Sequence, residues 1–147
     1  MKEAVRKFNT IAGKLSPDLV DNPAEMWEAL LGAAERVYEE AKEMLEAARS
    51  RDIKEYLDGL VDVKYTEAHA QLLLEMLGVD VVSAGEEVCK NNNLKFFTSL
   101  DEAKATAEHY NMQGQECYVE GVNYEGENLL VVKRVEDNKV LKPVGHP

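Results

Sequence analysis

Acidic side chains at helical spacing are the residues of this chain that are best suited to chemistry. Glu39, Glu40 and Glu43 lie in a segment whose pattern is typical of a helix, and Glu40 and Glu43 are one turn apart. The next expected helix carries Asp58 and Asp62 on one face. Because Asp62 lies between apolar residues, we expect its carboxylate to be partly buried and to need a partner or a metal ion.

Two acidic groups on helices joined by a short turn can converge on one cation. Ligand sets made only of oxygen select hard cations, so we expect Mg²⁺, with Mn²⁺ as a possible substitute. The expected metal ligands are Glu40, Glu43, Asp58 and Asp62. Taken alone, the glutamates of the first helix would more often form a solvated face. The position of Asp62 in an apolar stretch favours the metal site.

The first acidic group also carries a resemblance to a known superfamily. Glu39-Glu40-x-x-Glu43 resembles the EExxE motif of the all-α NTP pyrophosphohydrolases, which include MazG-like proteins, dimeric dUTPases and phosphoribosyl-ATP pyrophosphohydrolase.

The second motif of that superfamily, ExxD, fits this chain in two registers. Glu55-x-x-Asp58 matches the motif literally. Asp62, followed by Val63-Lys64-Tyr65, resembles the family's Asp before an apolar-apolar-Tyr run, and in that register the usual Glu falls at Gly59. Asp58 would then replace that Glu from one position earlier.

Further likeness lies downstream of the acidic helices. Asn92 and Lys95 resemble the phosphate-binding Asn and Lys of MazG-like proteins, and Lys142 lies in a tail that resembles their C-terminal segment. The resemblance implies a helical bundle over residues 1–95, an insertion over 96–138, and a segment 139–147 that returns to the bundle.

The resemblance implies a Mg²⁺-dependent nucleoside triphosphate pyrophosphohydrolase, which converts an NTP or dNTP to the monophosphate and pyrophosphate. The implied catalytic residues are Glu39, Glu40, Glu43 and Asp62, with Glu39 or Glu55 as a general base or a ligand to a further ion. A homodimer or homotetramer is implied in the same way. Two alternatives remain: a dUTPase-like or phosphoribosyl-ATP hydrolase on the same scaffold, and a non-enzymatic metal- or partner-binding bundle.

Composition narrows the choice of partners. The net charge of −11 over 147 residues argues against duplex nucleic acid, whose phosphates need clustered Lys and Arg. No apolar run approaches the length of a membrane span, and Cys89 and Cys117 lack the spacing of a zinc site or disulfide framework. We therefore expect a cytoplasmic protein that binds no membrane.

Periodicity predicts a mainly α-helical fold with a small C-terminal helix-plus-hairpin element. In the long second helix, an apolar stripe is expected to face the core, and its members are Trp27, Leu30, Leu31, Ala34, Val37, Tyr38, Ala41, Leu45 and Ala48. His69, on the acidic face of the third helix, is expected to be a core or pocket-edge residue and not a ligand. The expected helices cover residues 1–13, 23–50, 53–77, 81–93 and 99–114, and the expected strands 117–123, 129–135 and, as a third candidate, 139–142.

Overall fold

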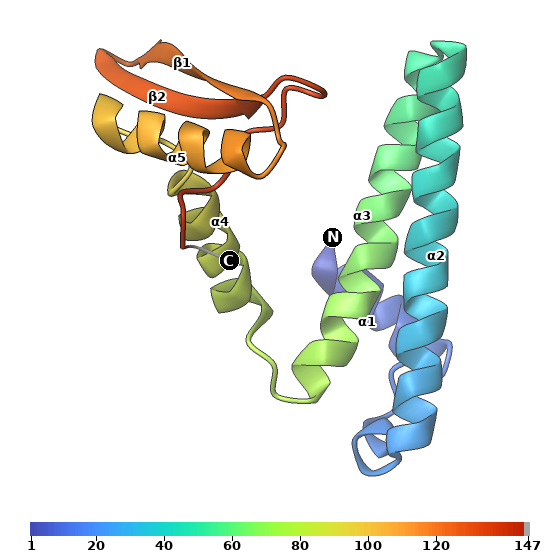
Figure 1. Cartoon of the computed structure of the whole chain (residues 1–147). Helices are drawn as coiled ribbons and strands as arrows, with labels where there is room; N and C mark the ends of the chain where they lie inside the picture. Colours follow the sequence, from blue (N-terminus) through green and yellow to red (C-terminus); the bar gives the residue numbers. More distant parts are fainter. Residues whose placement is uncertain (146–147) are drawn as a thin grey trace. The chain divides into compact units, whose positions relative to one another are not determined.

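The computed structural model describes residues 1–145, which form two compact units: residues 1–81, and the chain from residue 82 onward (Figure 1). The first unit is helical. The second contains helices and a two-stranded antiparallel sheet. The predicted mainly helical fold with a small C-terminal β-element is therefore confirmed. None of the helices formed by these described residues is long and apolar enough to cross a membrane.

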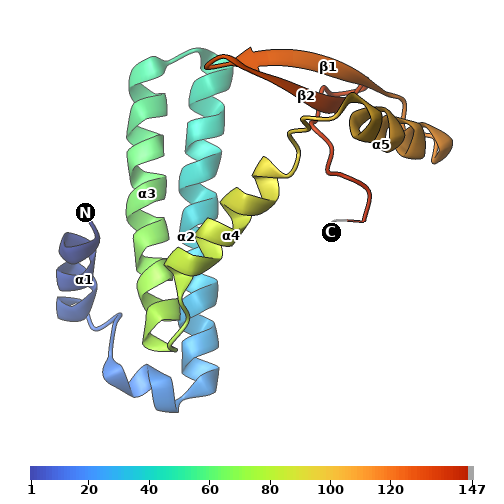
Figure 2. The ribbon, with the colours of Figure 1, turned by 90° about the vertical axis from the view of Figure 1, so that its left-hand side faces the viewer.

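Two long antiparallel helices build the first unit. They are α2 (Pro23–Ser50) and α3 (Ile53–Met76), which run side by side in Figures 1 and 2. A two-residue connection joins them. Arg51 adopts the left-handed conformation at φ 58°, and the Asp52 carboxylate accepts hydrogen bonds from the first backbone N–H groups of α3 at 3.1 Å. So short a connection forces the helices to pack antiparallel.

A close contact at Gly59 sets the register of this helix pair. A Cβ added to Gly59 would lie 3.1 Å from the backbone of Met44, so the two helices approach more closely there than larger side chains would allow. One turn further from the connection, on both helices, the same register brings Asp62 opposite Glu40.

The stripe of α2 that packs against α3 recurs every three or four residues and consists mostly of small or flexible apolar side chains. Its buried or half-buried members are Met26, Leu30, Ala33, Val37, Glu40, Met44 and Ala47. On α3 the matching positions are Gly59, Asp62, Thr66, His69, Leu73 and Met76. Glu40, Asp62 and His69 therefore lie on the two stripes that meet and not on solvated faces.

The remaining elements cover the open end of the helix pair, away from the connection. Helix α1 (Lys2–Ile11) packs on α3 and is held there by an ion pair of 2.7 Å between Lys2 Nζ and Glu75 Oε1. A 3₁₀ helix, η1 (Pro17–Asp21), packs on α2. The core of the unit gathers at this end and contains Val5, Leu15, Met26, Ala33, Leu72 and Leu73.

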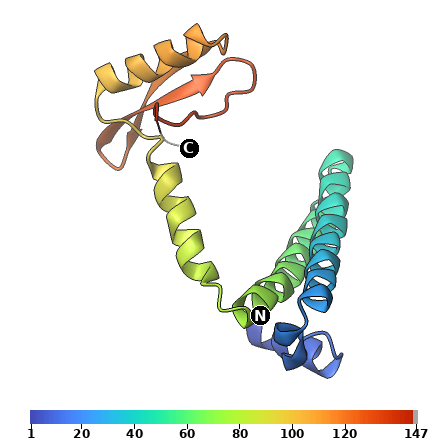
Figure 3. The same cartoon turned by 60° about the horizontal axis from the view of Figure 1, so that its bottom comes forward.

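The second unit has a core of its own. The elements of this unit are α4 (Val81–Asn93), α5 (Leu100–Met112) and the strands β1 (Cys117–Tyr124) and β2 (Glu127–Arg134). Helix α5 lies against the hairpin in Figure 3. Glu125 and Gly126 form the turn with φ of 48° and 84°, the left-handed values that two-residue hairpin turns need. The buried residues are Phe97, Ala103, Ala107, Cys117, Val132 and Leu141.

Several expectations differ from the structure. The boundary between units follows Val81, not residue 95, and the 139–145 segment packs within the second unit, where Leu141 is buried and Val140 bridges Lys133. That single bridge is all that the candidate third strand forms within residues 1–145, and the last two residues of the 139–147 segment lie outside the described residues.

Of the apolar stripe expected to form the core face of α2, Leu30, Val37 and Ala41 are half-buried, and the other six members are exposed. The exposed fractions are 71% for Trp27, 60% for Leu31, 65% for Tyr38 and 48% for Leu45. The stripe that faces α3 is offset from these residues by about a third of a turn at 100° per residue and carries smaller or more flexible side chains such as Ala33, Ala47 and Met44.

Candidate functional site

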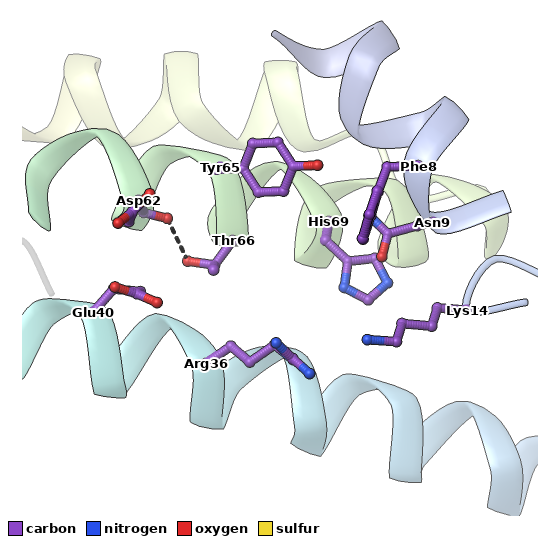
Figure 4. A pocket seen from close by; sticks show the side chains of 9 residues that line it. All are labelled: Phe8, Asn9, Lys14, Arg36, Glu40, Asp62, Tyr65, Thr66 and His69. Carbon is purple, nitrogen blue, oxygen red and sulfur yellow. Dashed lines mark hydrogen bonds between the residues drawn. The ribbon is translucent and has the colours of Figure 1, made fainter. Parts of the chain in front are cut away.

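A cavity of about 260 Å³ lies between α1, α2 and α3 in the first unit. Its walls combine acidic, basic and aromatic side chains (Figure 4). The lining residues are Phe8, Asn9, Lys14, Arg36, Glu40, Asp62, Tyr65, Thr66 and His69.

Glu40 and Asp62 form the acidic end of this cavity. The two carboxylates face each other from α2 and α3 in Figure 4. Burial, followed by the negative charges of Glu43, Asp62 and Glu39, raises the pKa of Glu40 above its ordinary value. This end therefore concentrates negative charge in a half-buried place, where a cation or a proton relieves the repulsion.

Lys14 and Arg36 form a basic end of the same cavity. Arg36 precedes Glu40 by one turn of α2, and Lys14 lies in the loop that follows α1. In Figure 4 their side chains extend toward one another. Within residues 1–145, neither side chain forms an ion pair.

His69 lies between these charges and is buried, with 9% of its surface exposed. Its ring hydrogen bonds to the backbone of Lys14, whereas Nε2 is buried without a hydrogen-bond partner. Burial chiefly, and the charges of Lys14 and Arg36 in addition, lower the pKa of His69 despite that hydrogen bond. The ring is therefore neutral at pH 7. This confirms the expectation of a pocket-edge histidine.

Two further contacts shape the walls. The rings of Phe8 and Tyr65 pack edge to face with centroids 6.4 Å apart, which fixes α1 against α3 beside the cavity. The hydroxyl of Thr66 donates to the backbone carbonyl of Asp62 at 3.0 Å, so its own lone pairs remain able to accept a hydrogen bond.

The predicted acidic residues differ in their surroundings. Asp62 is half-buried, as the apolar residues around it predicted, and lines the cavity with Glu40. Glu43 is exposed and does not line the cavity, and its negative charge raises the pKa of Glu40. Asp58 and Glu55 are exposed on α3 and do not line the cavity. Across residues 1–145, no three acidic, histidine or cysteine side chains are already gathered as a metal-binding group.

The predicted phosphate-binding residues all lie in the second unit. Lys95 and Lys142 line one cavity of about 340 Å³ together with Arg134 and Lys139. Asn92 lies at the end of α4 and does not line that cavity, although its carbonyl accepts a hydrogen bond of 3.1 Å from the backbone N–H of Lys95. Lys95 and Lys142, which are 47 positions apart, thus line one cavity, and their binding of phosphate stays a prediction.

The sequence analysis did not identify Lys14 or Arg36 as site residues, and it did not place Phe8 at the acidic site. Arg36 had a detectable signal, because it lies one turn from Glu40 on the same stripe. Lys14 and Phe8 had none, since only the packing of α1 on α3 brings them to the cavity.

Comparisons of the chain with protein-family models, with curated proteins and with solved structures find no match. The chemistry of the cavity therefore has to be inferred from its own residues.

Proposed function

We propose that this protein is a Mg²⁺-dependent nucleoside triphosphate pyrophosphohydrolase, with its catalytic centre at the α2–α3 cavity. The observation that carries the proposal is the pairing of opposite charges in one cavity: Glu40 and Asp62 at one end, and Lys14 and Arg36 at the other. A metal–triphosphate substrate has the complementary distribution, with a cation at one position and phosphate oxygens at the next.

The acidic end fits a hard divalent cation in its donor chemistry. The donors are carboxylate oxygens, and the pKa of Glu40 is raised in part by Glu43 and Asp62, which shows that these negative charges act on one another. Glu40, Glu43 and Asp62 would hold the ion. Glu43 and Asp58, the fourth expected ligand, do not line the cavity, so each would reach the ion only after a change of rotamer.

Bound Mg²⁺ would supply charge neutralisation for the phosphate oxygens and the leaving pyrophosphate. The residues of the chain would do the rest. Glu39, which directly precedes the proposed ligand Glu40, or Glu55 would take a proton from the attacking water or bind a further ion. Phe8 and Tyr65 would form the apolar wall beside the substrate. Asn92, Lys95 and Lys142 remain proposed phosphate-binding residues.

The test is release of pyrophosphate from a panel of ribo- and deoxyribonucleoside triphosphates with Mg²⁺ or Mn²⁺, compared with EDTA. Asp62→Asn and Glu43→Gln should lower kcat by about a hundredfold or more, because each removes a charge on which the metal depends. Glu28→Gln, an exposed glutamate on the same helix, is the matched control and should retain full activity. Wild-type turnover in either site variant, or none with any nucleotide, would refute the proposal.

A second candidate, a partner-binding or self-associating bundle, is favoured by the exposed stripe of α2. Trp27, Leu31, Tyr38 and Leu45 fall within roughly 40° of one another around the helix at 100° per residue. Such a continuous apolar stripe is typical of a protein interface. We propose that it joins copies of this chain into a homodimer or homotetramer, which is compatible with the enzymatic function.

A further inference from the structure

The imidazole of His69 presents an unexplained polar atom to the α2–α3 cavity. The residue is more than nine-tenths buried, and its Nε2 has no hydrogen-bond partner among the described residues. A buried nitrogen in this state costs free energy, so a native structure that keeps one needs a reason. The imidazole lines the cavity and extends between Arg36 and Lys14 in Figure 4, so a group bound there would lie next to this ring.

The surroundings of Nε2 specify the charge of that group. Lys14 and Arg36 both lie close enough to the imidazole for their positive charges to lower its pKa. No described carboxylate forms an ion pair with either cation. Two cations and one unpartnered nitrogen around a cavity match an anion with several oxygens.

We propose that the Lys14–Arg36–His69 end of the cavity binds a phosphate group, and that His69 Nε2 shares a proton with one of its oxygens. The inference rests on the proposed function only where it assigns the phosphate to a nucleotide or to the pyrophosphate product. Binding of the phosphate at this end needs neither a metal ion nor turnover. For the phosphate oxygens, Arg36 offers paired N–H donors and Lys14 offers a point charge.

The shared proton has two possible sources, and both balance. The second ionisation of a phosphate monoester has a pKa of about 6, so such a phosphate still carries its P–OH proton on a fraction of molecules at pH 7 and can donate it to neutral Nε2. Otherwise the imidazole takes a proton from solvent as the anion binds. Both routes place one proton between Nε2 and a phosphate oxygen, so affinity should fall as the pH rises.

The other titratable groups around the cavity do not reverse this expectation. Glu40 and Asp62 lie at the acidic end, and Asp62 precedes His69 by two helical turns, or about 10 Å along α3. The closer charges on the imidazole are Lys14 and Arg36, which an incoming anion would offset.

The experiment measures binding of inorganic pyrophosphate to the full chain in the presence of EDTA. Calorimetry gives the affinity, and ¹⁵N NMR of the histidine rings reports on their protonation. We expect Arg36→Gln and Lys14→Gln to weaken pyrophosphate binding by about tenfold or more each. Lys42→Gln should leave binding unchanged, because Lys42 lies on the same helix with its ammonium over the Tyr38 ring and does not line the cavity. The Nε2 signal of His69, assigned with His69→Gln, should move from its neutral to its protonated position on binding.

Equal weakening in Lys42→Gln, or an Nε2 signal that ignores pyrophosphate, would overturn the inference. Lys139→Gln tests the basic cavity of the second unit, and loss of binding in that variant alone would also overturn it. Circular dichroism excludes unfolding of each variant. Pyrophosphate binding of the expected kind without any turnover would reject the proposed function and keep this inference. Turnover without such binding at the Lys14–Arg36–His69 end would keep the proposed function and reject this inference.

Discussion

The close approach of α2 and α3 at Gly59 makes a sharp prediction for substitution of this glycine by alanine. The added Cβ would lie 3.1 Å from the Met44 Cα, Cβ and N atoms, and backbone in the middle of a long helix cannot move away locally. Relieving such a contact typically costs about 1–3 kcal/mol. Replacing a helix glycine by alanine gains about 1 kcal/mol. The net expectation for Gly59→Ala is a loss of about 1 kcal/mol in the free energy of unfolding.

Gly32→Ala is the matched control, because a Cβ at Gly32 in α2 would meet nothing within 4 Å. Gly32→Ala should raise the free energy of unfolding by about 1 kcal/mol, the usual gain for alanine over glycine in a helix. The two variants should therefore differ by about 2 kcal/mol in the free energy of unfolding. Urea unfolding followed by far-UV circular dichroism measures both. A Gly59→Ala protein as stable as Gly32→Ala would refute the register of the helix pair, and with it the facing positions of Glu40 and Asp62.

Further predictions concern charge and assembly. Glu40→Gln should stabilise the metal-free protein at pH 7, because the pKa of Glu40 is raised in the folded state. Protonated Glu40 contributes stability to the fold below about pH 4.5, and this stability is lost as the pH rises through the raised pKa. Mg²⁺ should then raise the Tm of the wild type more than that of the variant. Between pH 7 and pH 5 the free energy of unfolding should fall less in His69→Gln than in the wild type, because the lowered pKa of His69 makes protonation unfavourable in the folded state. Leu31→Glu should shift the mass measured by light scattering toward that of a monomer, whereas Met112→Glu, exposed on α5, should not. An unchanged mass for Leu31→Glu would remove the α2 stripe as the self-association surface.

Most of the local structure was readable from the sequence. The α2–α3 connection, the start of α5 after Ser99, whose side chain accepts a hydrogen bond from the Glu102 N–H, and the hairpin turn at Glu125–Gly126 each have a local signal in turn or capping residues. The partial burial of Asp62 was also predictable, because an acidic residue inside an apolar stretch of a helix has few solvated positions available.

The face of α2 that packs on α3 was not predictable in the same way. This helix carries two apolar stripes, and hydrophobicity alone favours the one with Trp27 and Leu31. The close contact between Gly59 and Met44 favours packing of the other stripe against α3, because helices that approach closely need small residues such as Ala33 and Ala47 between them. Lys14 could not be found because its place depends on how α1 packs, for which the sequence holds no local signal.

Residues 96–138, which the resemblance implies to be an insertion into the helical bundle, lie in the second unit together with the residues that flank them. An insertion leaves its host undisturbed when the two ends of the inserted segment lie close together, so that the flanking residues keep their places. Lys95, just before the segment, and Lys139 and Lys142, after it, line the same cavity. Phe97 pairs with Leu130 and Lys133 with Val140, which closes both ends of the segment onto the hairpin. Proximity of the ends therefore explains how Lys95 and Lys142 can share one cavity despite their separation in sequence, and why the 139–145 segment packs beside the hairpin that it follows.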